Sequence, residues 1–412
     1  MPLANTDHYA SLLRECIINN DITEGMKVHD SIVQDNLDGD RYLGNILVEM
    51  YDKCGGLLEA RLTFDRLKDK NVYTWNNIIA AYTRHGHDEE ALHLFHEMLH
   101  LVFPSTFTFT FALGACNNIE VLGEGRFVHD NAIYGGLDAD INVGTALIHM
   151  YGKCGSIIDA ERVFHRLHEH NIVTYTAMMA SYLHQSKNQE ALEIFRSMIK
   201  MRIILDEFSF TTALGACMGL NAIEDGIFVH TTIVCAGFDS NSVIESALVN
   251  MYGEHGQFED AKLVFAKSHE RNVALFTSLI TICVQLEYTE NVLEIFMKML
   301  DESLEPNELT YVSIITACAI STSLLDGKII HHMIVCNGLE SNFILASAIV
   351  NMFGKCGCLK DAHRVFEKIS QRTIVTWNTL ITAYTQQGYG KEVLNLYSQM
   401  QLQDVRPTEV TF

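Results

Sequence analysis

The hydrophobic residues of this chain recur at helical spacing in short, paired stretches. The clearest pair lies in residues 141–171, where one apolar stripe consists of Val143, Leu147, Met150 and Cys154 and the next of Ile157, Ala160, Phe164 and Leu167. Spacings of three and four residues place each stripe on one face of an α-helix. Gly155 separates the two stripes. The pattern therefore predicts two helices joined by a glycine turn.

The stretch around this turn occurs four times. It reads Met150-Tyr151-Gly152-Lys153-Cys154-Gly155 and its other copies begin at Met50, Met251 and Met352, so the steps are 100, 101 and 101 residues. Two further landmarks keep the same interval, and they are the aromatic residues Trp75, Tyr175, Phe276 and Trp377 and the cysteines Cys16, Cys116, Cys217 and Cys318. A fixed interval of this kind indicates an array of repeated units and not a set of independent domains.

Each long period divides into three helical hairpins. The predicted units are 6–40, 41–71, 72–105, 106–140, 141–171, 172–206, 207–241, 242–272, 273–307, 308–342, 343–373 and 374–408. Such short hairpins cannot bury their own apolar faces, so each must stack on its neighbours. Alanines at the same place after each turn (Ala60, Ala160, Ala261 and Ala362) would let the two helices of a hairpin approach closely. With no break in composition, we expect a single array that continues beyond Phe412.

Composition narrows the function classes. The formal charge is −22, which argues against indiscriminate binding to polyanions. The eleven cysteines lack C-x-x-C spacing, so we interpret most of them as small buried thiols in a reducing compartment and predict no metal site. No apolar run is long enough for a membrane span, and the acidic N-terminal stretch resembles neither a secretory signal nor a transit peptide.

The units that begin Val72-Tyr73-Thr74-Trp75-Asn76 and Ile374-Val375-Thr376-Trp377-Asn378, with second-helix sequences such as Glu90 to Met98, resemble pentatricopeptide repeats. The rotation of 35-, 35- and 31-residue units is similar to the PLS subclass of plant organellar proteins, with the units in the order L, S, P from residue 6. The resemblance implies an all-α, right-handed superhelical α-solenoid that binds single-stranded RNA, about one unit per base. In this family the fifth and the last residue of a unit read the base.

The base-reading pairs implied by the resemblance are Asn45 with Asn71, Asn76 with Ser105, Thr145 with Asn171, Thr176 with Asp206, Ser246 with Asn272, Thr277 with Asn307, Ser347 with Thr373, and Asn378 with Thr408. By the family's pattern they favour, in order, a pyrimidine, cytosine, adenine, guanine, adenine and adenine, and the last two pairs have no clear preference. L-like units, such as the one with Val312, are poor readers. The implied target is pyrimidine-C-x-A-G-x-A-A-x, written 5′ to 3′.

Two other places in each unit complete the implied interface. The second residue would sandwich the base, and it is apolar or aromatic in Tyr73, Val173, Val243 and Val375 but weaker in Asn142 and Ala274. Lys53, Arg84, Lys153 and Lys355 end the predicted first helices and would face RNA phosphates, whereas Glu254 replaces this cation in unit 242–272. Acidic residues such as Asp88, Glu190, Glu259 and Glu290 lie on second helices, so a negative exterior can coexist with a neutral or mildly basic groove.

Motifs that suggest chemistry have simpler explanations. His96-Glu97-Met98-Leu99-His100 matches the zinc motif H-E-x-x-H, but Glu97-Met98 belongs to the repeat pattern and no third ligand is evident. His87-Asp88-Glu89 gives only half of a deaminase signature. His29, His129, His230 and His331 recur once per period, which is typical of a packing or surface role. We therefore predict no catalytic residues, no metal, no cofactor and no small-molecule substrate.

The leading hypothesis is a non-enzymatic, sequence-specific RNA-binding array. The resemblance implies recognition of a mitochondrial or chloroplast transcript for C-to-U editing or processing, with editing-complex proteins as further partners and any deaminase activity in a C-terminal domain beyond this chain. A tetratricopeptide-like scaffold that binds a protein in its groove is the alternative, and the net charge suits it better. A degenerate array that binds nothing is a third. For any single polar residue named above, a solvated helix surface explains the residue equally well, and the recurrence of Asn, Thr or Ser at the same place in the units favours the RNA-reading interpretation.

Overall fold

The computed structural model describes residues 2–339, 342–369, 372–403, 405–408 and 411. Across these residues the regular structure is 24 α-helices without a strand, which confirms the predicted all-α fold. The chain forms two compact units, here called the N-terminal unit (Met1–Leu205) and the C-terminal unit (Asp206–Phe412). The prediction of one continuous array over residues 6–408 stays a prediction.

The helices of the N-terminal unit are α1 (Pro2–Asn19), α2 (Ile22–Gln34), α3 (Arg41–Lys53), α4 (Leu57–Arg66), α5 (Val72–Arg84), α6 (Asp88–Leu99), α7 (Thr106–Ile119), α8 (Leu122–Tyr134), α9 (Ile141–Lys153), α10 (Ile157–Arg166), α11 (Ile172–His184) and α12 (Asn188–Lys200). Those of the C-terminal unit are α13 (Glu207–Leu220), α14 (Ile223–Ala236), α15 (Ser242–Glu254), α16 (Phe258–Lys267), α17 (Val273–Gln285), α18 (Thr289–Asp301), α19 (Glu308–Ile320), α20 (Leu324–Cys336), α21 (Phe343–Lys355), α22 (Leu359–Lys368), α23 (Ile374–Gln386) and α24 (Gly390–Leu402).

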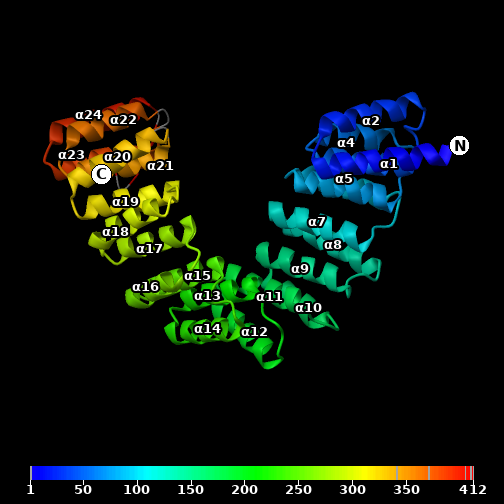
Figure 1. Ribbon diagram of the computed structural model, residues 1–412, viewed down its shortest axis with the longest axis horizontal. Coiled ribbons are helices and arrows are strands. Elements are labelled where there is room, and N and C mark those ends of the chain that lie inside the picture. Colours follow the sequence, from blue (N-terminus) through cyan, green and yellow to red (C-terminus); the bar gives the residue numbers. More distant parts are fainter. Residues whose placement is uncertain (1, 340–341, 370–371, 404, 409–410, 412) are drawn as a thin grey trace. The chain divides into compact units, whose positions relative to one another are not determined.

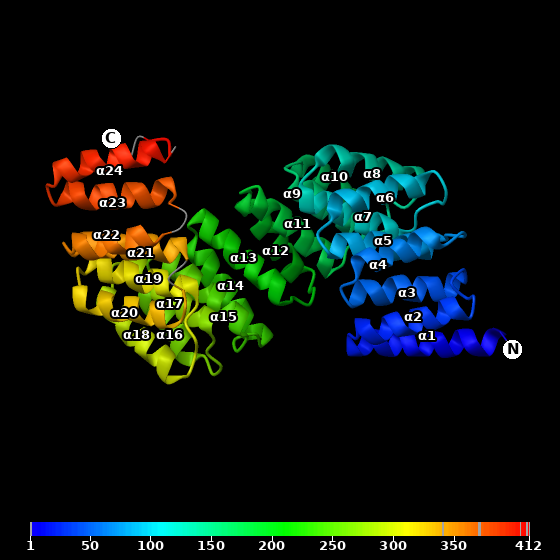
Figure 2. The same cartoon turned by 90° about the horizontal axis from the view of Figure 1, so that it is seen from above.

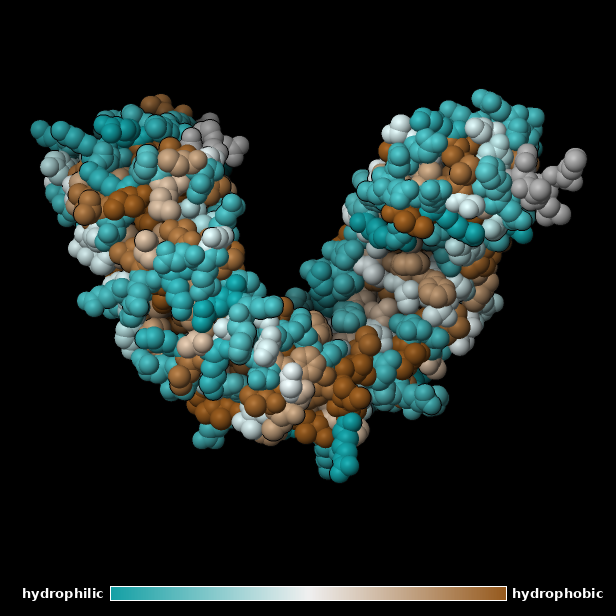
Figure 3. Space-filling view, in the orientation of Figure 1, coloured by the Kyte–Doolittle hydropathy of each residue, from teal (hydrophilic) through white to brown (hydrophobic). Residues whose placement is uncertain are grey.

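Within each unit the odd-numbered helices, here called first helices, stack one on the next (Figures 1 and 2). Each even-numbered second helix contacts its own first helix, and every second helix except α12 and α24 also contacts the first helix that follows it within its unit. The first helices therefore form a continuous layer in each unit. The visible face of the molecule mixes hydrophobic and hydrophilic side chains over both units (Figure 3).

The repeated landmarks hold each hairpin together. Gly155 has φ +83°, a left-handed conformation that favours glycine and reverses the chain between α9 and α10. Its counterparts Gly55, Gly256 and Gly357 also have positive φ. Ala60, Ala160, Ala261 and Ala362 are fully buried, which confirms the predicted close approach of the two helices.

Repeated aromatic pairs join successive hairpins. The rings of Phe64 and Trp75 meet edge to face with centroids 4.8 Å apart, and those of Phe366 and Trp377 meet at 4.7 Å. Offset and edge-to-face arrangements of this kind add roughly 0.5–1.5 kcal/mol beyond the burial of their apolar area. The aromatic landmark of the sequence is therefore a packing element between the second helix of one hairpin and the first helix of the next.

The cysteines are free thiols, and five of them are buried: Cys16, Cys116, Cys217, Cys283 and Cys318. Burial raises the pKa of Cys116 to about 12, so this thiol stays protonated. Cys54, Cys154, Cys356 and Cys358 are only half-buried, so the prediction of buried thiols is wrong for these four. Among the helices that the structure describes, none has the length and apolar character needed to cross a membrane.

Candidate functional site

The second residue of most first helices presents a large apolar side chain to solvent. Tyr73 is 53% exposed and Val375 is 61% exposed, and Val173 and Val243 are exposed to a similar degree. The sequence interpretation missed Phe107, which is 68% exposed, and its counterparts Phe208 and Leu309. These three lie in L-like units, which the resemblance treats as poor readers. An exposed apolar side chain at one helical position in successive units is suited to stacking on bases.

The fifth residues of the first helices are less accessible than a solvated surface would make them. Asn45, Asn76, Thr176 and Thr277 are buried, and Thr145, Ser246, Ser347 and Asn378 are half-buried. The interpretation as solvated helix surface is therefore wrong for the first four. Thr145 donates its hydroxyl hydrogen to the carbonyl of Ile141 at 2.6 Å, and Ser246 and Ser347 make the same bond one turn back. With the hydrogen used internally, these oxygens remain available as acceptors.

The last residues of the units have a structural duty. Asn71, Ser105, Asn171, Asn272, Asn307 and Thr373 are N-caps of the following first helices, and each accepts a hydrogen bond from a backbone N–H three residues on. Asp206 caps α13 in the same way. Polar side chains at an N-cap satisfy backbone donors that have no partner inside the helix. Helix capping therefore accounts for part of the recurrence of Asn, Ser, Thr and Asp at this place.

Two of the predicted pairs are joined directly. Asn76 donates from Nδ2 to Ser105 Oγ at 3.0 Å, and Thr108 Oγ1 donates to Asn76 Oδ1 at 2.5 Å. Asn378 Nδ2 lies 3.2 Å from Thr408 Oγ1 in the corresponding pair. Asn76 and Ser105 thus meet between the first helix α5 and the N-terminus of the next first helix, α7.

A third pair is linked through an intermediate side chain. Thr310 joins Thr277 and Asn307 by hydrogen bonds of 2.7 and 2.8 Å. Among the described residues no direct side-chain bond joins Asn45 to Asn71, Thr145 to Asn171, Ser246 to Asn272 or Ser347 to Thr373. Thr176 belongs to the N-terminal unit, whereas Asp206 is the first residue of the C-terminal unit.

A cavity of about 450 Å³ lies beside the Asn378 pair. Its lining combines the apolar Val375 with Asn378, Thr408 and Asn351. The cavity thus brings together the second, fifth and last residues of one predicted unit. A planar group with hydrogen-bonding edges matches this combination of an apolar wall and amide and hydroxyl groups.

The predicted phosphate-facing cations end their helices as expected. Lys53, Arg84, Lys153 and Lys355 are the last residues of α3, α5, α9 and α21. Lys153 is half-buried, with its ammonium 3.8 Å from Glu120. Arg84 forms an ion pair with Asp52, whose side chain is only 4% exposed. Asp52 occupies the place that glycine holds at residues 152, 253 and 354, and the sequence interpretation missed its effect on Arg84.

The recurrent histidines are packing residues. The Nδ1 atom of His129 lies 2.8 Å from the hydroxyl of Tyr151, and His29 and His230 repeat this bond with Tyr51 and Tyr252. Burial lowers the pKa of His129 and so favours the neutral imidazole, which shares one hydrogen bond with the Tyr151 hydroxyl. His331 instead packs edge to face on Phe353.

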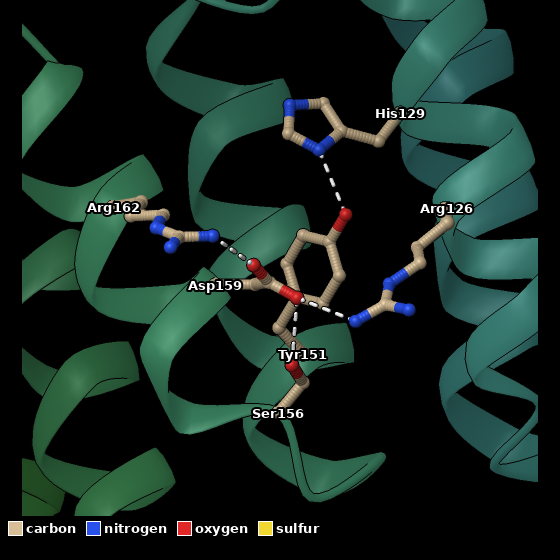
Figure 4. A network of polar contacts seen from close by, with 6 residues as sticks. All are labelled: Arg126, His129, Tyr151, Ser156, Asp159 and Arg162. Carbon is tan, nitrogen blue, oxygen red and sulfur yellow. Dashed lines mark hydrogen bonds and ion pairs between the residues drawn. The ribbon is translucent and has the colours of Figure 1, made fainter.

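A carboxylate lies close to one of these pairs (Figure 4). Asp159 accepts hydrogen bonds from Ser156, Arg126 and Arg162 at 2.7, 2.9 and 3.1 Å. The bond from Ser156 and the charge of Arg126 hold the pKa of Asp159 below its ordinary value. This network joins Arg126 of α8 to Asp159 and Arg162 of α10, and the Asp159 carboxylate is fully engaged by these neighbours. We therefore assign it a structural role.

The H-E-x-x-H stretch is engaged in helix packing. His96 Nε2 lies 2.9 Å from Glu124 Oε2, and its ring stacks on Phe127 with centroids 4.8 Å apart. Asp88 of the H-x-E stretch accepts a bond from Asn118 at 3.1 Å. Within the described part of the chain, no group of three His, Cys, Asp or Glu side chains is arranged to hold a metal ion.

The fold and this surface define a helical-hairpin repeat protein. Three family models match the chain: the PPR repeat family at residues 70–118, 170–219 and 372–412, the pentatricopeptide repeat domain at 264–319, and the PPR repeat at 145–172, 246–273 and 345–374. The chain belongs to the pentatricopeptide repeat family.

Two curated relatives from Arabidopsis thaliana are pentatricopeptide repeat-containing proteins. The chain is 32% identical to a chloroplastic one over 99% of its own length and 66% of the relative's. It is 31% identical to a mitochondrial one over 98% of its own length and 47% of the relative's. The chain therefore spans about half to two thirds of the relatives that it matches.

Solved structures show the same fold. The pentatricopeptide repeat protein PPR10, in complex with an 18-nt psaJ RNA element, aligns over 91% of this chain and 57% of its own with a TM-score of 0.76 and 20% identity. PPR10 from maize aligns over 98% of this chain and 64% of its own with a TM-score of 0.68 and 19% identity. At this identity the likeness establishes the fold.

Proposed function

We propose that this chain is a sequence-specific binder of single-stranded RNA. The main support for this proposal is the cavity lined by Val375, Asn378 and Thr408. It offers an apolar wall for stacking and hydrogen-bonding groups at the places that the family uses to read a base. The pair Asn76 and Ser105, joined at 3.0 Å, repeats the arrangement in the N-terminal unit. The RNA bound to PPR10 supports the same function for this fold.

The finer proposal concerns the biological role. The order of L, S and P units supports membership in the PLS subclass and recognition of a transcript for C-to-U editing or processing. The chloroplastic and mitochondrial names of the relatives support an organellar location. Any deaminase activity would belong to a further domain. Membership in the pentatricopeptide repeat family favours this function over a protein-binding scaffold.

A specificity switch tests RNA reading directly. By the family's pattern, the pair Asn76 and Ser105 favours cytosine and the pair Thr277 and Asn307 favours adenine. We expect the double substitution Asn76→Thr and Ser105→Asn to transfer the preference at the second position of pyrimidine-C-x-A-G-x-A-A-x from C to A. Asparagine is a good N-cap, so α7 keeps its cap. Fluorescence anisotropy with labelled C and A oligonucleotides measures the change.

The expected reversal is roughly tenfold in the ratio of the two affinities, since one good base contact contributes about 1–3 kcal/mol of discrimination. A matched control is Ser197→Asn on the second helix α12, which leaves base preference unchanged because its hydroxyl bonds only the carbonyl of Glu193. Equal affinity of the wild type for the target and for a scrambled RNA would overturn the proposed function.

A further inference from the structure

The C-terminal ends of α7, α9 and α11 enclose a pocket of about 190 Å³ in the N-terminal unit, here called the His149 pocket. Its lining residues are Asn117, His149, Lys153, Ala180, Ser181 and His184. None of these is a base-reading residue. Two imidazoles and an ammonium group therefore converge on one small polar space.

The pocket lies on the same helical face as the base-reading side chains. Along α9, residues 142, 145, 149 and 153 are spaced by three and four positions, so they share one face of the helix. Asn142 and Thr145 hold the stacking and reading places at the start of this face, and His149 and Lys153 follow toward its end. A strand bound at the reading places would thus have its backbone within reach of the pocket.

Close helix packing fixes the walls of the pocket. A Cβ atom at Gly152 would lie 2.1 Å from Ser181 Oγ, so only glycine permits this approach of α9 and α11. Ser181 donates to the carbonyl of Ile148 or Ala177, at 3.1 and 2.8 Å, and Gln185 donates to the carbonyl of Gly152 at 3.0 Å. The side chains of His149, Lys153 and His184 therefore project from two closely packed helices, α9 and α11.

This combination of residues occurs once in the four periods. At the places of His149 and His184 the later periods have Asn250 with Gln285 and Asn351 with Gln386, and the first period has Glu49 with Arg84. The place of Lys153 is held by Lys53, Glu254 and Lys355. Histidine at both of these places is thus a property of this pocket and not of the repeat.

We propose that His149, Lys153 and His184 form a phosphodiester-binding site whose affinity increases as the pH falls. The inference rests on the proposed RNA binding and adds a pH-dependent contact to it. Its ligand is a backbone phosphate of the bound strand. A free phosphate ion has the same chemistry, so the experiment below separates the two.

The sign of the pH dependence follows from the surroundings of the imidazoles. The pocket walls desolvate His149 and lower its pKa, so the free protein holds it mainly neutral at pH 7. A phosphate beside the ring favours the charged form, so binding takes up a proton. The other titratable groups that line the pocket are Lys153 and His184, and the Glu120 carboxylate lies 3.8 Å from the Lys153 ammonium. Affinity for RNA therefore rises as the pH falls.

The test compares RNA affinity at about pH 8 and about pH 6 at constant ionic strength, using anisotropy with the predicted nonamer. We expect the wild type to bind roughly threefold to tenfold more tightly at the lower pH. The double substitution His149→Asn and His184→Gln installs the residues that later periods carry, and it removes most of this gain. The control His168→Asn changes an exposed histidine between α10 and α11 and keeps the full gain.

A second measurement identifies the ligand. NMR titration of the His149 ring gives its pKa in the free protein, with RNA and with inorganic phosphate. RNA raises this pKa, and inorganic phosphate at millimolar concentration leaves it unchanged. An equal rise with inorganic phosphate contradicts a site built for the bound strand. A double variant that binds RNA with the wild-type pH dependence overturns the inference while the proposed function stands. Failure to bind RNA at either pH overturns both.

Discussion

Asp52 shows how one side chain alters the charge of a first-helix face. Its carboxylate is almost fully buried, pairs with Arg84 and lies 3.5 Å from His85 Nε2. The charge of Arg84, which the sequence predicted as a phosphate contact, is therefore partly neutralised by Asp52, although the arginine side chain remains 45% exposed. The other periods have glycine at this place and no such pair. A substitution relative to the repeat pattern thus weakens a contact that the pattern itself would supply.

We expect Asp52→Asn to release the charge of Arg84 for RNA. One additional phosphate contact on a single strand steepens the plot of log affinity against log salt concentration by about 0.7. The asparagine amide still accepts a hydrogen bond, so we expect the free energy of unfolding to fall by only about 1 kcal/mol. Affinities at several salt concentrations measure the slope. Asp65→Asn, which removes an exposed ion pair with Arg61 on α4, serves as control and leaves the slope unchanged; an unchanged slope for Asp52→Asn would contradict the prediction.

At the scale of the helix, the last residue of a unit is an N-cap in the structure and a base reader in the proposed function. The Asn171 side chain accepts a hydrogen bond from the backbone N–H of Thr174 at 2.9 Å, and the Thr174 hydroxyl oxygen accepts one from the backbone N–H of Asn171 at 2.8 Å. This reciprocal cap begins α11. The same side chain is the proposed base reader of the preceding unit. Capping and recognition can be separated because several residue types cap equally well but offer different donors and acceptors.

Two substitutions of Asn171 separate these purposes. Asn171→Asp keeps an efficient cap, so we expect unfolding free energy to change little while preference at the fourth RNA position moves from A to G. Asn171→Ala removes the cap and costs about 1 kcal/mol of stability, together with base preference. Urea unfolding and anisotropy measure the two effects. If Asn171→Asp leaves the preference for A intact, this residue acts only as a cap.

At the scale of the helix, the sequence predicted the secondary structure correctly but did not reveal how several side chains are used. Hydrophobic spacing and turn glycines were sufficient to predict the hairpins, because apolar periodicity directly reflects a buried helix face. The sequence interpretation missed that Asn171 and its counterparts cap helices, although the capping pattern Asn-x-x-Thr is present in the sequence. Burial of Asn45, Asn76, Thr176 and Thr277 could not be foreseen, because it depends on how closely the next hairpin packs. The pairing of Arg84 with Asp52 likewise depends on packing across 32 residues.

Across the whole molecule, one histidine per long period links folding to pH. Burial lowers the pKa of His29, His129, His230 and His331 in the folded protein. The unfolded chain therefore binds protons more readily than the folded one as the pH falls below about 6.5. The contribution of these residues is present above that pH and is lost as the pH falls toward the depressed folded-state values.

We expect the free energy of unfolding to decrease between about pH 7.5 and about pH 5.5. Urea unfolding followed by circular dichroism at each pH measures it. Replacing all four histidines by asparagine flattens this part of the curve, although it lowers stability at neutral pH because the bonds to Tyr51, Tyr151 and Tyr252 are lost. A quadruple variant with the same decrease as the wild type would assign the pH dependence to other groups.

The N-caps have a consequence for how such arrays acquire new targets. Asparagine, aspartate, serine and threonine are all good initiators of a helix, and the same four residue types stand at the predicted last positions of this chain. Under the proposed function, a point mutation among them redirects a unit to a different nucleotide while its helix keeps a cap. On that proposal, a change of RNA target does not require a loss of folding stability, because each of the four residue types begins a helix well.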